Sequence, residues 1–232
     1  MKIIKNESID QIKARIREQT SKTIDPIVAS RVENIIATVQ EEGDAALKAY
    51  AQEFDGVTLN ELKVSAEQID LAVKNVDPAV IKALEKAAAN IRSFHQLERQ
   101  KSFEDSPRSG VIRGTKVTPL SAVGIYVPGG TAAYPSSVLM NALPAKIAGV
   151  ENIIMVTPPQ KNGLNGAVLA AAKIAGIDSI YQVGGAQAIA ALAYGTESIP
   201  QVDKITGPGN AYVATAKRAV FGQVAIDMIA GP

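Results

Sequence analysis

The sequence AVGIYVPGG at residues 122–130 decides the fold, because a short apolar run ends there at a proline and two glycines. The same pattern returns three times downstream, and each run again ends in a loop that carries glycine or proline. These further runs, which we predict as strands, lie at 152–156, 179–183 and 202–205. Continuously apolar strands of this length are typical of a parallel sheet with both faces covered.

Helical patterns fill the intervals between these strands. We predict the helices at about 136–148, 163–175, 186–194 and 210–220. Strands that alternate with helices indicate βα units. Residues 121–232 are therefore predicted to form a doubly wound α/β domain.

The charged residues are distributed unevenly along the chain. Of 24 basic and 23 acidic residues, 11 lie within 121–232 and the remaining 36 lie in the first 120. The first part has the spacing of amphipathic helices. Asp25-Pro26 and Asp77-Pro78 are typical helix starts, and Ser65 with Gln68 has the pattern of a capping box.

Three segments follow from these patterns. Residues 1–20 are predicted to form a helical arm, 21–120 a mainly helical portion, and 121–232 the α/β domain. Within the helical portion, residues 101–110 are predicted to be a loop, and 111–120 a strand with some exposed positions.

Composition excludes several classes of site. The chain has no cysteine and one histidine, His95, so it cannot build a thiolate or multi-histidine metal site. His95 lies on the predicted helix after Pro78, where a packing or surface role is the simpler interpretation. A net charge of +1 and 4% aromatic residues argue against nucleic-acid binding. We expect no signal peptide, no membrane span and a cytoplasmic location.

The carboxyl ends of the predicted strands are the candidate binding edge, because ligands bind there in open parallel sheets. Three loops stand out at 126–130, 184–187 and 206–210, each followed by a helix whose N-terminus favours phosphate. A nucleotide or dinucleotide is one interpretation. The other is that βα turns need glycine simply to turn, since neither G-x-G-x-x-G nor the P-loop pattern occurs.

Three polar side chains lie at this edge. Tyr126 could stack on a ligand or hydrogen-bond to it, or it could pack at the end of its strand. Gln187 could donate to a ligand or serve as a turn residue. Asn210 could also donate to a ligand, but its position before a helix favours an N-cap role.

These loops also carry a family resemblance. The segments 122–130, VGGAQAIAALAYG at 183–195, DKITGPGN at 203–210 and IDMIAGP at 226–232 resemble the histidinol dehydrogenase family. The similarity extends over essentially the whole chain, but over only about the first half of the usual family length. It implies a Rossmann-like α/β unit, and makes residues 21–120 part of an incomplete second Rossmann-like domain.

The resemblance implies a function as well. Family members are zinc-dependent homodimers of histidine biosynthesis that oxidise L-histidinol to L-histidine through an aldehyde, reducing two NAD. Tyr126, Gln187 and Asn210 match the family's NAD contacts. The chain departs mildly from the family pattern at two positions. The family often has proline where this chain has Ile229, and phenylalanine occurs where it has Thr206.

The family's catalytic residues would lie beyond this chain. The zinc ligands, the glutamate–histidine pair and a substrate-binding serine are all expected after Pro232, and His95 matches none of them. We therefore expect no catalytic residue and no metal ligand here, and at most an NAD-binding surface. The alternative is a non-catalytic fold unit that self-associates and binds no nucleotide.

Overall fold

The computed structural model describes residues 8–20, 25–129, 133–177 and 179–229. Two predicted motifs, at 122–130 and 226–232, therefore lie partly outside the described residues. Helices precede the first strand along the chain: α1 (Ile9–Thr20), α2 (Pro26–Glu42), α3 (Asp44–Tyr50), the π-helix η1 (Ala51–Asp55), α4 (Ala66–Lys74) and α5 (Pro78–Gln96). An antiparallel hairpin follows, formed by β1 (Phe103–Arg108) and β2 (Val111–Thr115).

The α/β part has the predicted alternation of strands and helices. Its elements are β3 (Ala122–Tyr126), α6 (Pro135–Ala148), β4 (Asn152–Thr157), α7 (Gly166–Ala175), β5 (Ser179–Gln182), α8 (Gly185–Tyr194), β6 (Lys204–Thr206), α9 (Ala211–Val220) and β7 (Ala225–Ile226). In the described residues these strands form one parallel sheet in the order β5-β4-β3-β6-β7. The prediction of a parallel α/β fold is confirmed.

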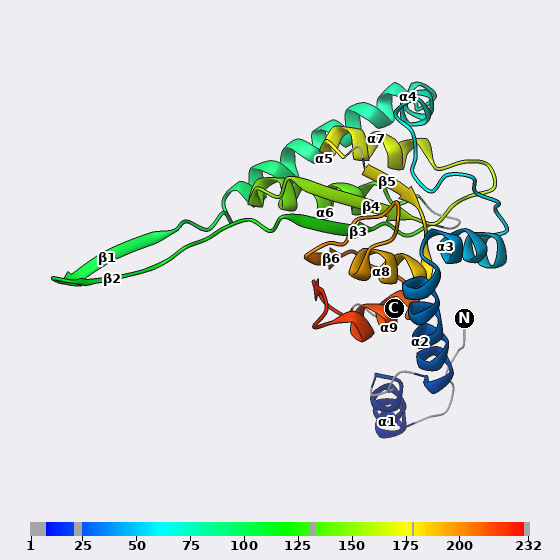
Figure 1. Cartoon of the computed structure of the whole chain (residues 1–232), viewed down its shortest axis with the longest axis horizontal. Helices are drawn as coiled ribbons and strands as arrows, with labels where there is room; N and C mark the ends of the chain where they lie inside the picture. Colours follow the sequence, from blue (N-terminus) through cyan, green and yellow to red (C-terminus); the bar gives the residue numbers. More distant parts are fainter. Residues whose placement is uncertain (1–7, 21–24, 130–132, 178, 230–232) are drawn as a thin grey trace.

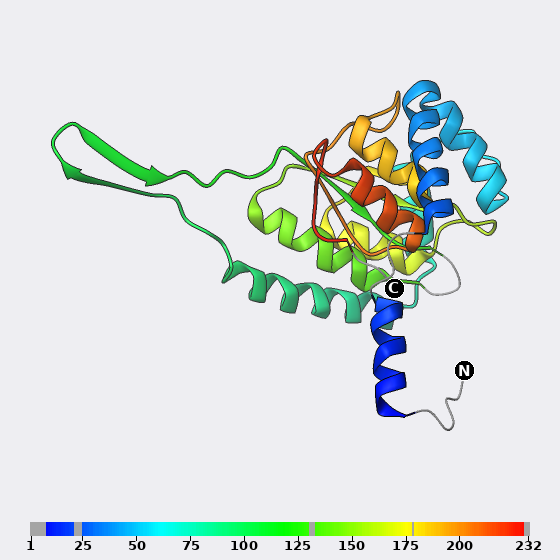
Figure 2. The same cartoon turned by 90° about the horizontal axis from the view of Figure 1, so that it is seen from below.

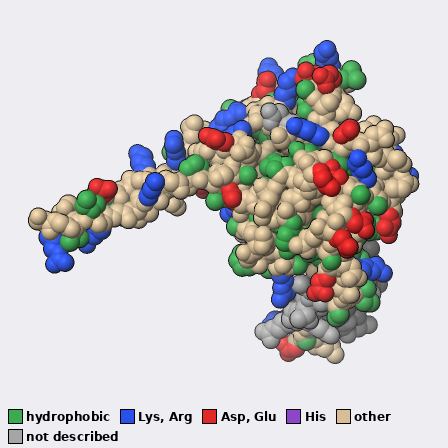
Figure 3. Space-filling view, viewed as in Figure 1, with side chains coloured by type: hydrophobic (Ala, Val, Ile, Leu, Met, Phe, Trp, Pro, Cys, Tyr) green, Lys and Arg blue, Asp and Glu red, His purple; other side chains and the backbone are tan. Residues whose placement is uncertain are grey.

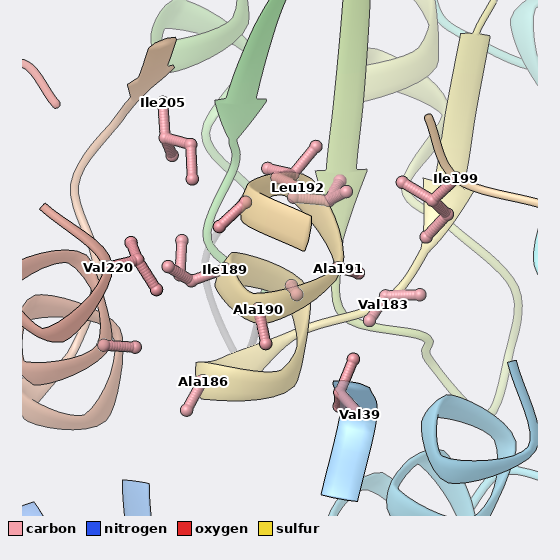
Figure 4. Packing of buried hydrophobic residues seen from close by; sticks show 14 of the residues in the cluster. Val39, Val183, Ala186, Ile189, Ala190, Ala191, Leu192, Ile199, Ile205 and Val220 are labelled. Atoms are coloured by element: carbon pink, nitrogen blue, oxygen red, sulfur yellow. The ribbon is translucent and has the colours of Figure 1, made fainter. Parts of the chain in front are cut away.

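Both faces of the sheet are covered, because successive residues of a strand point to opposite sides. In β4, Ile153 and Met155 join one buried cluster with α4–α7, while Ile154 and Val156 join another with α2, α8 and α9. Figures 1 and 2 show the two helical layers on either side of the sheet. Helix α8 lies at the centre of the second cluster, where its small alanine side chains allow the neighbouring elements to pack closely against it (Figure 4).

The helical portion begins its helices as the sequence predicts. Asp25 and Asp77 cap α2 and α5 through side-chain oxygens, and Ser65 and Gln68 form the capping box of α4. The segment before α4 also joins the sheet edge. Val64 N donates to Ile180 O and Gln182 N donates to Leu62 O, each at 2.8 Å, so this segment lies antiparallel beside β5.

One prediction is wrong: residues 101–110 are not a loop, because β1 occupies most of them. Figures 1 and 2 show the hairpin projecting away from the body. Every residue of β1 is exposed, so no alternation of apolar and polar residues marks this strand in the sequence. Gly110, with φ +78°, lies in the turn that pairs the two strands.

The strand β7 was also not predicted. It has two residues, paired in parallel with Lys204 and Ile205 of β6, which is too short for a periodic pattern. Among the described residues, no helix combines the length and apolar character that crossing a bilayer requires.

Candidate functional site

The candidate site lies at the carboxyl edge of β3 and β6. These strands are neighbours in the sheet, yet the chain goes from β3 outward to β4 and β5 before it crosses back to β6. The loops after β3 and β6 therefore diverge to opposite sides of the sheet. Ligands of open α/β sheets bind at the strand ends beside such a switch point.

Tyr126 is the last residue of β3 and is buried, with 4% of its surface exposed. Its hydroxyl oxygen accepts a hydrogen bond from Gly185 N at 3.1 Å, at the first residue of α8. Burial raises the pKa of the Tyr126 phenol, and the Asp55 carboxylate adds to this, while the hydrogen bond from Gly185 opposes it. The phenol is therefore neutral near pH 7 and connects the end of β3 to the start of α8.

Gln187 lies in the first turn of α8 and is 3% exposed. Its side chain folds back against Gly185, whose φ is +61°, and a Cβ at Gly185 would lie 2.5 Å from Gln187 Oε1. The positive φ favours glycine at 185, and any larger side chain there would also require Gln187 to move. Tyr126 and Gln187 thus meet at the same glycine.

Asn210 is exposed and caps α9, as its N-cap interpretation predicts: its Oδ1 accepts from Val213 N at 3.1 Å. The loop before it approaches β3 closely. A Cβ at Gly207, whose φ is +114°, would lie 2.2 Å from Tyr126 O. The structure therefore brings all three predicted residues to one edge, with Asn210 connected to Tyr126 through the Gly207 loop.

Sequence reasoning missed two charged residues at this edge. Lys217 of α9 forms an ion pair with Asp227, which follows β7, and both side chains also bind the main chain of Gly207. The sequence did hold a signal for Lys217. It shares the apolar face of α9 with Val213 and Val220, where a lysine is unusual.

A hollow of about 560 Å³ lies between the second half of α6, the residues around the end of α5 and the segment before β3, and it extends to the end of β6. Its lining includes Thr206, Asp227, Met140 of α6 and Leu120. The Thr206 Oγ1 atom is buried and has no hydrogen-bond partner among the described residues. An orphaned polar atom at the end of β6, beside glycine loops and helix N-termini, fits the edge to a polar ligand such as a dinucleotide.

The described residues do not fit a metal. They contain no group of three or more His, Cys, Asp or Glu side chains placed to hold one. His95 lies near the end of α5, and its Nδ1 is 2.5 Å from Oε2 of Glu98, which lies just after the helix. In Figure 3, Lys and Arg side chains predominate over the projecting hairpin, while charges of both signs lie over the rest of that face.

The strand order, the switch-point edge and the glycine loops define a Rossmann-like α/β protein. A family model described as histidinol dehydrogenase matches residues 17–232. The chain belongs to the histidinol dehydrogenase family, which is a family of oxidoreductases.

Relatives and a solved structure agree with this assignment. A histidinol dehydrogenase of Lactiplantibacillus plantarum is 62% identical over 232 residues, covering 100% of this chain and 54% of that protein. One from Listeria innocua is 61% identical over 94% of this chain and 51% of its own length. The crystal structure of histidinol dehydrogenase from Elizabethkingia anophelis matches with TM-score 0.88 and 38% identity, covering 98% of this chain and 52% of that one. The chain thus spans about half the length of the relatives it matches.

Proposed function

We propose that this chain is the amino-terminal portion of an NAD- and zinc-dependent histidinol dehydrogenase, and that its sheet edge contributes to the NAD-binding surface. The observation that carries the proposal is the convergence of Tyr126, Gln187 and Asn210, through Gly185 and Gly207, at the switch point. Dinucleotides bind at such switch points with their phosphates near helix N-termini.

The proposed reaction of the whole enzyme sets what the chain has to do. L-histidinol loses a hydride and a proton to give the aldehyde. Water adds to the aldehyde, and the hydrate loses a second hydride and two protons to give the carboxylate of L-histidine. Two NAD molecules each accept one hydride. This chain's contribution is to bind and orient the dinucleotide. Gln187 lies in the first turn of α8 and Asn210 at the start of α9, and the two helices pack in the same layer.

We further propose that the chain alone does not catalyse. Its described residues offer no metal-binding cluster, and the zinc of the family would be held outside it. We also propose that the segments divide at 20/21 and 120/121, and that residues 21–120 form part of an incomplete domain. The proposal includes a cytoplasmic location and a homodimeric whole enzyme.

Calorimetric titration with NAD tests the binding surface. Asn210→Ser keeps an N-cap oxygen but removes the amide, so weaker binding in this variant reports a ligand contact and not a lost cap. Asn165→Ser is the matched control, because Asn165 caps α7, where Gly166 packs against α4. Gln187→Met removes the second amide at similar volume. We expect saturable heat in the parent and in Asn165→Ser, and about tenfold weaker binding in the other two.

Two results would overturn the proposal. A parent chain that gives no saturable heat with NAD removes the binding function. Steady NADH formation from L-histidinol by the isolated chain with zinc removes the claim of inactivity.

A second candidate function is self-association without nucleotide binding. It is favoured by large apolar side chains that stay exposed, among them Leu97 and Phe94 near the end of α5 and Met140 beside the hollow. Sedimentation over a range of concentrations distinguishes it, since this candidate requires a concentration-dependent dimer and no NAD heat.

A further inference from the structure

A buried lysine is the least expected feature of the candidate edge. Among the residues that the structure describes, Lys217 is the charged member of the buried set, with 1% of its side chain exposed. Its partner Asp227 is partly accessible, with 30% of its side chain exposed. An apolar side chain at 217 would continue the packing of Val213 and Val220 without the cost of burying a charge. The charge therefore calls for a role other than core packing.

The pair binds one residue at both of its main-chain groups. Lys217 Nζ donates to Gly207 O at 3.0 Å, and Gly207 N donates to Asp227 Oδ2 at 2.9 Å. Asp227 Oδ1 accepts from Lys217 Nζ and, at 2.7 Å, from Met228 N. We call this arrangement of Lys217, Asp227 and Gly207 the Gly207 latch. It connects α9, the segment after β7 and the loop after β6.

Gly207, the residue held by this pair, lies between the end of β3 and the start of α9. Gly207 has φ +114° and lies so close to Tyr126 O that a Cβ would come within 2.2 Å of it. Three residues later, Asn210 begins α9. A shift of Gly207 would therefore move the start of α9 relative to the end of β3, which are the two sides of the candidate site.

We propose that Lys217 and Asp227 are positioning residues that hold the Gly207 loop in the shape needed to bind a dinucleotide. Neither touches the ligand in this proposal; both act through Gly207. The inference rests on the proposed NAD-binding function and extends it to residues that this function did not include. Charge-assisted hydrogen bonds suit such a task, because they are shorter than neutral ones and roughly twice as strong.

The first test compares two lysine variants. Lys217→Met removes the ammonium but keeps an unbranched side chain of similar length. Lys173→Met is its control, with the same change of charge at a half-exposed ion pair with Asp70 on the other side of the sheet. Calorimetry should show NAD binding weakened about tenfold or more in Lys217→Met and unchanged in Lys173→Met. Equal affinity in Lys217→Met and the parent overturns the proposal.

A second comparison separates positioning from general stability. Leu169→Ala, in the opposite core cluster, destabilises the fold without touching the latch. Lys217→Met/Asp227→Leu removes both charges, so it contains no unpaired buried charge and should be more stable to urea than Lys217→Met alone. If the latch positions the loop, NAD affinity stays weak in this double variant and stays at the parent value in folded Leu169→Ala. If affinity follows urea stability across all the variants, the proposal is wrong.

Amide hydrogen exchange tests the latch without NAD. A failure of the latch proposal can therefore be distinguished from a failure of the proposed NAD-binding function. The Gly207 amide should be protected in the parent and exchange about tenfold faster in Lys217→Met, while amides of β4 stay unchanged. A parent that does not bind NAD removes the function and with it the claim about affinity. Equal Gly207 exchange in the parent and Lys217→Met removes the latch itself, whatever the parent binds.

Discussion

The hairpin β1–β2 and the parallel sheet β3–β7 hold their strands by different means. In the sheet, β3 and β4 are almost wholly buried, and alternate residues enter the two core clusters. In the hairpin, β1 is exposed along its whole length, and the strands are connected by main-chain pairing, a glycine turn and the Arg113–Asp105 ion pair. Burial therefore stabilises the parallel sheet, while local turn geometry specifies the hairpin.

The largest effect should come from deleting a side chain at the centre of the sheet side. Leu192 of α8 is fully buried and lies against Gly124 of β3. Leu192→Ala should lower the free energy of unfolding by about 2–5 kcal/mol, because it leaves a cavity. Ile112→Ala in the hairpin, at 72% exposure, should change it by less than about 0.5 kcal/mol. Urea unfolding of both variants checks this, and equal losses would contradict the comparison.

Removing one hydroxyl should have a smaller effect. Tyr126→Phe keeps the ring in the core but leaves the Gly185 N–H without its acceptor. We expect a loss of about 1–3 kcal/mol, the cost of an unpaired buried polar group. Urea unfolding gives the energy, and amide exchange at Gly185 locates it. Tyr50→Phe is a control, because Tyr50 stacks on Phe54 through its ring. If both variants lose the same stability, the bond to Gly185 contributes nothing.

A carboxylate of the body should make stability depend on pH. Burial raises the pKa of Asp44, but hydrogen bonds from Ser198 and Thr196 outweigh it and lower the pKa below its ordinary value of 3.8. Because the pKa of Asp44 is lower in the folded state than in the unfolded state, its ionised carboxylate stabilises the fold above pH 3.8. This stabilisation is lost as the pH falls through the lowered pKa of the folded state.

Asp44→Asn should reduce the loss of stability between about pH 5 and 2. Because Asp44 is only partly buried, we expect no more than about 1 kcal/mol at neutral pH. Urea unfolding as a function of pH measures both. Asp105→Asn in the hairpin is the matched control for the loss of one carboxylate. An unaltered acid limb in Asp44→Asn would show that its hydrogen bonds do not favour the charged form.

The smallest global effect should come from the hairpin ion pair. Arg113 is exposed and donates to both Asp105 oxygens, at 2.8 and 3.0 Å. Arg113→Ala should leave the urea midpoint unchanged and speed amide exchange only within the hairpin, and high salt should weaken the pair in the parent. A shifted midpoint would mean that the hairpin is coupled to the sheet.

Sequence reasoning found the elements whose signals are local. Asp25 and Asp77 before prolines predict the starts of α2 and α5, and apolar runs that end in glycine or proline predict β3 to β6 within about two residues. It missed β1, whose exposed residues leave no periodic pattern, and β7, which has two residues. At the site it placed Tyr126, Gln187 and Asn210 at strand ends, but it could not find the partners of Gly207.

The sequence by itself determined the α/β class, the helix starts and the family, because spacing, caps and motifs are read over a few neighbouring residues. Only the tertiary structure decided that β3 lies beside β6, that Tyr126 bonds to Gly185 and that Lys217 is buried against Asp227. Tyr126 and Gly185 are 59 residues apart in the chain. Their contact depends on how the whole sheet packs between its two helical layers, since burial leaves each polar group only the partners that the fold brings to it.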